Sequence, residues 1–110
     1  MKFLLLATAF ATTTAAAQPR AQSAEECLAF AEFALVASTL AKHGIAREKA
    51  ETVLPDIYTL DADHVKTLAR AILDAAYRPE PMEPRQFATV LGNACMRSGG
   101  SMEGILGTRL

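Results

Sequence analysis

The sequence predicts an all-α protein, a small four-helix bundle with one disulfide that joins its first and last helices. Apolar side chains recur with helical spacing in four separate stretches. No stretch has the alternating pattern or the Asn-Gly and Asp-Gly turns of β-hairpins. The two cysteines lie near opposite ends of a helical region, and the 110 residues suffice for one domain.

The first residues have the pattern of a secretory signal peptide. Met1-Lys2 is positive, residues 3–10 are apolar, and Ala15-Ala16-Ala17 is a small-residue cleavage pattern. A membrane anchor would need roughly 20 apolar residues, and this run is shorter. We therefore expect residues 1–17 to be removed, and no cysteine follows the cleavage site to carry a lipid.

The charge of the mature chain argues against two classes of partner. Lys2 is the only charged residue of the leader, so its loss changes the net charge from −1 to about −2. No basic cluster is present, so we expect no nucleic-acid partner. No second apolar segment is long enough for membrane insertion after signal cleavage. The expected location is periplasmic or secreted.

The stretch 25–42 is expected to be the central helix, because it is apolar almost all the way round and needs neighbours on several sides. Ser23 is its expected N-cap and Gly44 its left-handed end. Residues 18–23 before it are polar and contain a proline, which predicts a flexible mature N-terminus. One face carries small side chains for close packing against the fourth helix: Cys27, Ala31, Ala34, Ser38 and Ala41.

Three further helices are predicted, at residues 45–58, 62–77 and 84–98. Pro55 should kink the second, Asp61 should cap the third, and Pro84 should occupy the first turn of the fourth. The residues expected to face inward on the second helix are Ala46, Ala50, Val53, Leu54 and Ile57. On the third helix they are Val65, Leu68, Ala69, Ile72, Leu73 and Ala76. On the fourth helix they are Phe87, Val90, Leu91, Ala94, Cys95 and Ser98. Gly99-Gly100 should end the helical domain, residues 24–100. The tail, residues 101–110, carries Met102, Ile105 and Leu106 among glycines, and the sequence leaves open whether it forms a short turn that docks on the bundle.

Two cysteines in an exported chain of this size predict a disulfide between Cys27 and Cys95. Closing so long a loop should stabilise the fold by roughly 4 kcal/mol. A redox-active pair would need a C-x-x-C spacing, which is absent. Helix starts in an antiparallel pair lie beside helix ends, so the bridge also agrees with the predicted helices.

No pattern predicts a catalytic, cofactor-binding or metal site. Asp61 and Asp63 are explained as residues of a helix start, which leaves His64 as a surface or first-turn histidine rather than a metal ligand. Residues 99–104 lack the G-x-S-x-G spacing of a serine hydrolase. The carboxylates of residues 25–32 read as a solvated face, and the methionines at 82, 96 and 102 read as packing residues. We therefore expect no enzyme.

The C-terminal Thr108-Arg109-Leu110 has the form of a ligand for a PDZ-type domain. Such a domain would bind the terminal carboxylate and the side chains of Thr108 and Leu110. These two residues are therefore the predicted C-terminal recognition residues.

The mature chain resembles the small, exported, alanine-rich helical proteins of Gram-negative bacteria, a group without an assigned activity. The resemblance rests on Glu26-Cys27-x-x-Phe30-Ala31, Lys42-His43-Gly44-Ile45, residues 71–77 and residues 87–95. More loosely, it is similar to the acid-stress periplasmic chaperones of the HdeA type and to secretin pilotins. These likenesses imply an exported helical protein and bring no catalytic residue.

The leading hypothesis from the sequence is an exported, non-enzymatic helical protein that acts by protein–protein interaction. One alternative is a periplasmic holdase for acid stress. Another is a small-ligand binder, with a pocket among Phe30, Phe33, Phe87 and Tyr58, or an adaptor of a secretion system. For these aromatic residues, filling the core is the simpler interpretation. The partner and the oligomeric state stay open.

Overall fold

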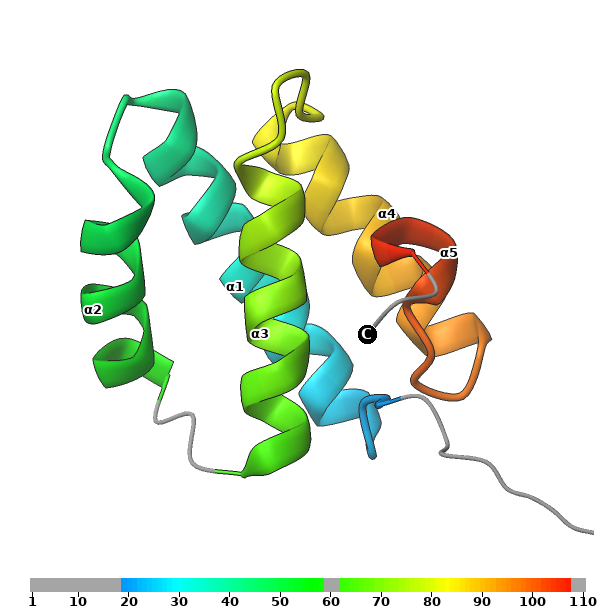
Figure 1. Ribbon diagram of the computed structural model, residues 1–110. Coiled ribbons are helices and arrows are strands. Elements are labelled where there is room, and N and C mark those ends of the chain that lie inside the picture. The colour runs from blue at the N-terminus through cyan, green and yellow to red at the C-terminus, as the bar shows by residue number, and fades with distance from the viewer. Residues whose placement is uncertain (1–18, 59–61, 108–110) are drawn as a thin grey trace, which may run out of the picture.

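The computed structural model describes residues 19–58 and 62–107, and within them the chain forms helices and no strand. The helices are α1 (Ala24–Lys42), α2 (Arg47–Tyr58), α3 (Asp63–Ala76), α4 (Pro84–Arg97) and α5 (Glu103–Leu106) (Figure 1). The predicted all-α class is confirmed. The predicted signal peptide, residues 1–17, lies outside the described residues.

Two side-chain hydrogen bonds hold the start of α1, one from the N-cap Ser23 and one from Glu26. The Ser23 hydroxyl accepts a hydrogen bond from the Glu26 N–H at 3.1 Å, and the Glu26 carboxylate accepts one from the Gln22 N–H at 2.9 Å. Glu25 and Glu26 in the first turn suit the positive end of the helix dipole. The predicted N-cap, Ser23, is confirmed.

Glycines end both α1 and α4 in the left-handed conformation that disfavours other residues. Gly44 follows α1 at φ +78°, and Gly99 follows α4 at φ +61°. After Gly44 the Ile45 N–H donates a hydrogen bond to the Leu40 carbonyl in the last turn of α1. After Gly99 the Gly100 N–H donates one to the Cys95 carbonyl in the last turn of α4. The predicted ends of these two helices at Gly44 and Gly99 are thus confirmed.

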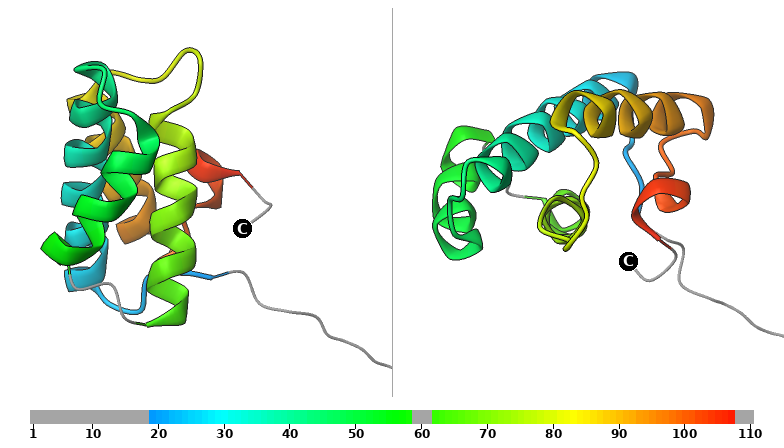
Figure 2. Two further views of the ribbon diagram at one scale, coloured as in Figure 1. Left: turned by 60° about the vertical axis from the view of Figure 1, so that its left-hand side comes forward. Right: turned by 90° about the horizontal axis from the view of Figure 1, so that it is seen from above.

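Helix α1 is the central helix of the described structure, because α4, α3 and α2 all pack on it. Its most extensive contact is with α4, which runs antiparallel beside it, while α3 and α5 lie in a second layer (Figure 2). The predicted four-helix bundle is not confirmed. In such a bundle α3 and α4 would pack directly on each other; here α5 contacts both of them.

The α1–α4 pair is held at both ends. At one end Cys27 and Cys95 form the predicted disulfide, with a Cα–Cα distance of 5.6 Å. It joins α1 to the fourth of the five described helices rather than to the last. At the other end the Lys42 ammonium lies 3.0 Å from the Glu83 carboxylate, in an exposed ion pair.

The core lies between α1 and the other helices. Its largest fully buried side chains are Phe33, Leu54, Leu68, Ile72, Leu91, Met102 and Cys95. Three residues predicted to face inward are exposed instead: Ala46, Val53 and Ser98. Ala46 precedes α2 and Ser98 is the C-cap of α4, so the helical pattern no longer positions them. Val53 is exposed because α2 packs mainly on α1, which needs only a narrow apolar stripe.

The described part of the segment before α1, which the sequence predicts to be flexible, contacts the rest of the molecule at Ala21. Ala21 is 3% exposed, and its N–H donates to the Gly100 carbonyl at 2.9 Å. This bond ties the start of the chain to the loop after α4. The sequence left open whether the tail docks; in the structure α5 contacts α3 and α4, and both Met102 and Leu106 are buried.

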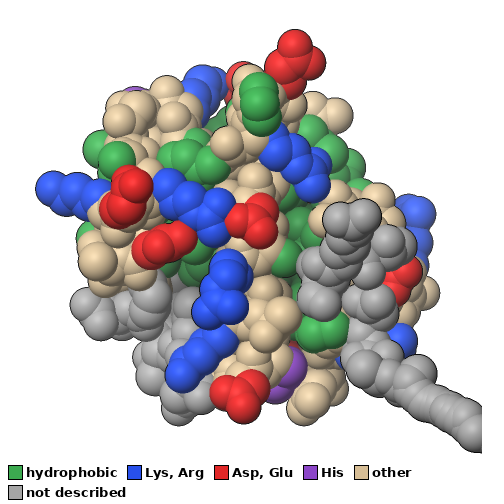
Figure 3. Space-filling model, in the orientation of Figure 1, with side chains coloured by type: hydrophobic (Ala, Val, Ile, Leu, Met, Phe, Trp, Pro, Cys, Tyr) green, Lys and Arg blue, Asp and Glu red, His purple; other side chains and the backbone are tan. Residues whose placement is uncertain are grey.

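Helix α3 begins at Asp63 with Ala62 at the N-cap, so the predicted cap at Asp61 was one residue early. The face that α2 and α3 share carries Lys and Arg side chains among Asp and Glu side chains (Figure 3). Arg47 forms an ion pair with Glu51 within α2 and a second one with Asp74 of α3. Among the described residues, the ion pair of Arg47 with Asp74 therefore connects these two helices.

Candidate functional site

The largest described hollow is a groove on the outer side of the α1–α4 pair, with a volume of about 850 Å³. The residues that line it come from α1 and α4: Glu25, Leu28, Ala29, Ala31, Glu32, Leu35, Ala88, Thr89, Gly92, Asn93 and Met96. On α1 they span residues 25–35, which is about 15 Å of helix. The groove is therefore almost three helical turns long.

Small residues form the floor of the groove, because α1 and α4 approach each other closely there. A Cβ placed on Gly92 would lie 3.2 Å from the Cβ of Ala31, so a larger residue at Gly92 would require Ala31 to shift by a few tenths of an ångström. The small face predicted for α1 is thus in contact with α4. The walls carry two large apolar side chains that water reaches, Leu28 at 61% and Met96 at 49% exposure.

The two walls of the groove differ in charge. Glu25 and Glu32 stand on the α1 wall, seven residues and about two turns apart. The α4 wall offers the neutral polar side chains of Thr89 and Asn93, and no Lys or Arg is among the described lining residues. A ligand in this groove would therefore meet an apolar strip with negative charge along one side.

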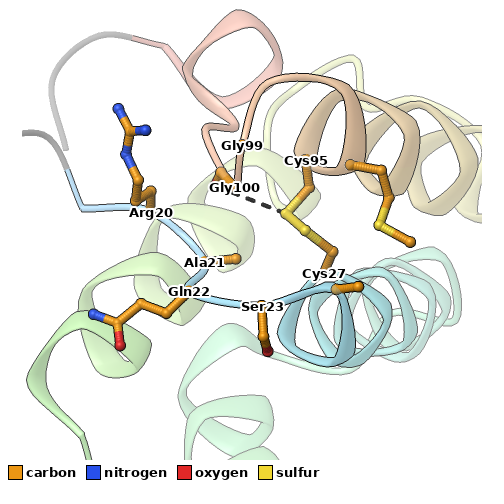
Figure 4. A pocket seen from close by; sticks show the side chains of 10 residues that line it. Arg20, Ala21, Gln22, Ser23, Cys27, Cys95, Gly99 and Gly100 are labelled. Atoms are coloured by element: carbon orange, nitrogen blue, oxygen red, sulfur yellow. Dashed lines mark hydrogen bonds between the residues drawn. A yellow bond between two sulfur atoms is a disulfide. The ribbon is translucent and has the colours of Figure 1, made fainter.

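A second hollow, of about 540 Å³, adjoins the groove at the disulfide (Figure 4). The segment 20–24, the Gly99-Gly100 turn and Met96 surround it, so Met96 borders both hollows. Cys27 and Cys95 are 3% and 0% exposed. The Cys95 sulfur lies 3.7 Å from the Gly100 carbonyl, which is a packing contact because a disulfide sulfur carries no proton. The disulfide is a buried structural element.

Glu26 and His64 form a pair that the sequence does not indicate, since 38 residues separate them. His64 Nε2 lies 3.0 Å from the Glu26 carboxylate, and the pair links α3 to the start of α1. Burial raises the pKa of Glu26, but its hydrogen bonds with the Gln22 N–H and His64 hold the pKa below its ordinary value of 4.5. His64 is therefore a structural partner of Glu26.

This pairing predicts a contribution to stability that acid removes. Because the pKa of Glu26 is lower in the folded state, its stabilising effect is present above 4.5 and is lost as the pH falls through the folded value. Glu26→Gln should therefore be less stable than the native protein at about pH 7, with a difference that shrinks towards about pH 3. Urea unfolding at several pH values measures this difference. A difference that stays constant over this range would contradict the assignment.

The other residues singled out in the sequence have structural places or lie outside the described part. Phe30, Phe33 and Phe87 are buried in the core and line none of the three hollows described here. The side chain of Tyr58 and the predicted recognition residues Thr108 and Leu110 lie outside what the structure describes. Sequence patterns assigned Met96 to packing, and they could not show that it stays half exposed beside α1.

No group of three or more His, Cys, Asp or Glu side chains in the described part of the chain could hold a metal ion. No helix there is long and apolar enough to cross a membrane. A buried disulfide in a small chain points to an oxidising compartment. Comparison with protein-family models, curated proteins and solved structures finds no significant match to this chain.

Proposed function

We propose that the protein is an exported, non-enzymatic binding protein, and that the α1–α4 groove receives an amphipathic helix of a partner protein. The observation that carries the proposal is the exposure of Leu28 and Met96 on the walls of this groove. Apolar side chains at the edge of a helical groove are how proteins bind the apolar face of another helix. The buried disulfide supports export to an oxidising compartment such as the periplasm.

The charge of the groove selects one kind of occupant. Glu25 and Glu32 lie about two turns apart on α1, so a complementary helix carries Lys or Arg about seven residues apart beside its apolar stripe. A second copy of this chain is disfavoured, because a symmetric contact through the groove would bring the same carboxylates together. The proposed occupant is thus a basic, amphipathic helix of another protein.

Site-specific photo-crosslinking tests this proposal in cells that make the protein. A photoreactive residue in place of Leu28 should capture a partner whose cross-linked peptide is an amphipathic helix with Lys or Arg beside the apolar stripe. The control position is Val53, which is 41% exposed on α2 and lies outside the groove. Equal capture at both positions, or capture only of a second copy, would overturn the proposal.

Binding of the identified peptide should then depend on both features of the groove. We expect Leu28→Asp to weaken it by about thirtyfold, the usual cost of losing a binding hot spot. Stability should be unchanged, because the side chain is already exposed. Glu25→Lys with Glu32→Lys should weaken binding of the basic peptide and strengthen binding of a peptide with Glu in place of its Lys and Arg. Calorimetric titration of each variant measures these changes, and insensitivity to charge reversal would argue against this mode of binding.

A further inference from the structure

A third hollow, of about 380 Å³, lies at the end of the α1–α4 pair opposite the disulfide. Its lining comes from three separate parts of the chain: the last turn of α1, the end of α3, and the proline-rich connector that leads to α4. Its volume is within the range of small-molecule pockets. The size and mixed lining make it a candidate ligand site separate from the groove.

Ser38 is the feature of this hollow that the fold does not explain. It is 3% exposed, the one polar residue in the buried set of the described chain, and it lines the hollow. Its hydroxyl makes no hydrogen bond within the described residues. The neighbouring Thr39 shows the alternative, since its hydroxyl donates to the Leu35 carbonyl at 2.7 Å. A buried hydroxyl without a partner is unfavourable unless another molecule supplies one.

The charged groups around the hollow indicate which molecule would do so. Lys42 lies one turn after Ser38 on α1, on the same side of the helix, and its ammonium is paired with Glu83. Arg78 also lines the hollow and forms no ion pair within the described part of the chain. Two cations and one carboxylate leave one positive charge for a ligand to balance. Arginine is well suited to bind a carboxylate.

The remaining walls are apolar. Ala41, Ala76 and the rings of Pro79, Pro81 and Pro84 line the hollow, and Met82 beside them is 37% exposed. Tyr77 also contributes its ring, while its hydroxyl is already used to donate to the Ile45 carbonyl at 2.8 Å. The rigid proline rings form a wall that keeps its shape without a ligand. These surfaces suit the compact apolar body of a small molecule.

We infer that this hollow binds a small organic monoanion, a carboxylic acid with a compact apolar body. Its carboxylate accepts hydrogen bonds from Ser38 and Arg78 and lies beside the Lys42 ammonium, and its apolar body packs on the proline rings. Neither α1 nor α3 supplies all of these groups. The site exists only because the connector returns past the end of α1. It does not depend on the groove or on its proposed partner.

Titration of the purified, oxidised protein with sodium 3-methylbutanoate, followed by amide NMR, tests this inference. We expect shift changes at the end of α1 and in the connector, with Ser38→Ala weakening binding about tenfold. The matched control is Thr39→Ala, which removes the adjacent hydroxyl that does not line the hollow and should leave the affinity unchanged. The neutral alcohol 3-methylbutanol and inorganic phosphate test the charge and the apolar body separately, and both should bind more weakly.

Stability of the free protein gives a second, independent result. If the Ser38 hydroxyl has no partner, Ser38→Ala should raise the melting temperature by about 2–5 °C, whereas Thr39→Ala should not. A lower melting temperature for Ser38→Ala would mean that the hydroxyl is already satisfied and would overturn the inference. The inference also fails if the carboxylate causes no shift changes at the hollow, if phosphate binds as tightly, or if Ser38→Ala leaves the affinity unchanged.

Discussion

Replacing both cysteines, Cys27→Ala with Cys95→Ala, should lower the free energy of unfolding by about 4 kcal/mol. The bridge closes a loop across a sequence separation of 68 residues, and this length sets the conformational entropy that it removes from the unfolded chain. Domains of about 90 residues are usually stable by only about 5–10 kcal/mol. The double variant should therefore retain about half of the native stability. Urea unfolding followed by circular dichroism measures the loss.

Reduction provides the matched comparison for this double variant. Dithiothreitol should shift the unfolding midpoint of the native protein almost to that of the double variant and should leave the variant itself unchanged. Both cysteines are buried, so reduction should be slow in the folded protein and fast at urea concentrations that unfold it. A double variant with the native midpoint would show that the helices hold each other without the covalent link.

Gly100→Ala should destabilise the protein by roughly 3 kcal/mol, which is far more than a glycine substitution in an exposed turn normally costs. Gly100 has φ +99°, and a Cβ there would lie 1.9 Å from the carbonyl oxygen of Ala21. The obstacle is backbone, so no side-chain rotation relieves it. The segment before α1 would have to leave its place, and the hydrogen bond between Ala21 and Gly100 would be lost.

Gly107→Ala is a close control, because Gly107 has φ +100° and no atom within 4 Å of the same Cβ position. It should cost only the about 1–2 kcal/mol of holding a residue with a Cβ at φ 100° and ψ 168°, a backbone region that suits glycine. The difference between the two variants therefore isolates the contact with Ala21. Hydrogen exchange at the Ala21 amide should be fast in Gly100→Ala and remain slow in Gly107→Ala. Equal losses of stability in both variants would contradict this account.

Local signals explain why much of the fold could be predicted from the sequence. Ser23, Gly44 and Gly99 act within one turn of the helix ends that they mark, so adjacent residues suffice to locate them. The pairing of Cys27 with Cys95 followed from there being two cysteines. Asp61 shows the limit of such signals, since a residue that commonly caps helices stands one position before the actual cap.

The interactions that could not be predicted all depend on how distant segments meet. Glu26 and His64 are 38 residues apart, and Ala21 bonds to a carbonyl near the other end of the chain. Ser38 was assigned to a face of small packing residues, and it is buried in the structure. The hollow that it lines forms only where the connector passes the end of α1, which the sequence does not indicate. The groove likewise depends on the distance between α1 and α4, which the contact of Ala31 with Gly92 determines. Helical periodicity carries no information on these distances.

The pairing of α1 with α4 also governs the order in which the protein can fold. Helix α1 is made early, but its most extensive partner is the fourth helix. Helix α5, which contacts α3 and α4, is made after all of them. Until α4 is made, the apolar surface of α1 has only α2 and α3 to cover it. Contacts between such distant segments form late and slow down folding. During synthesis the chain would thus stay incompletely packed until almost its whole length had been made.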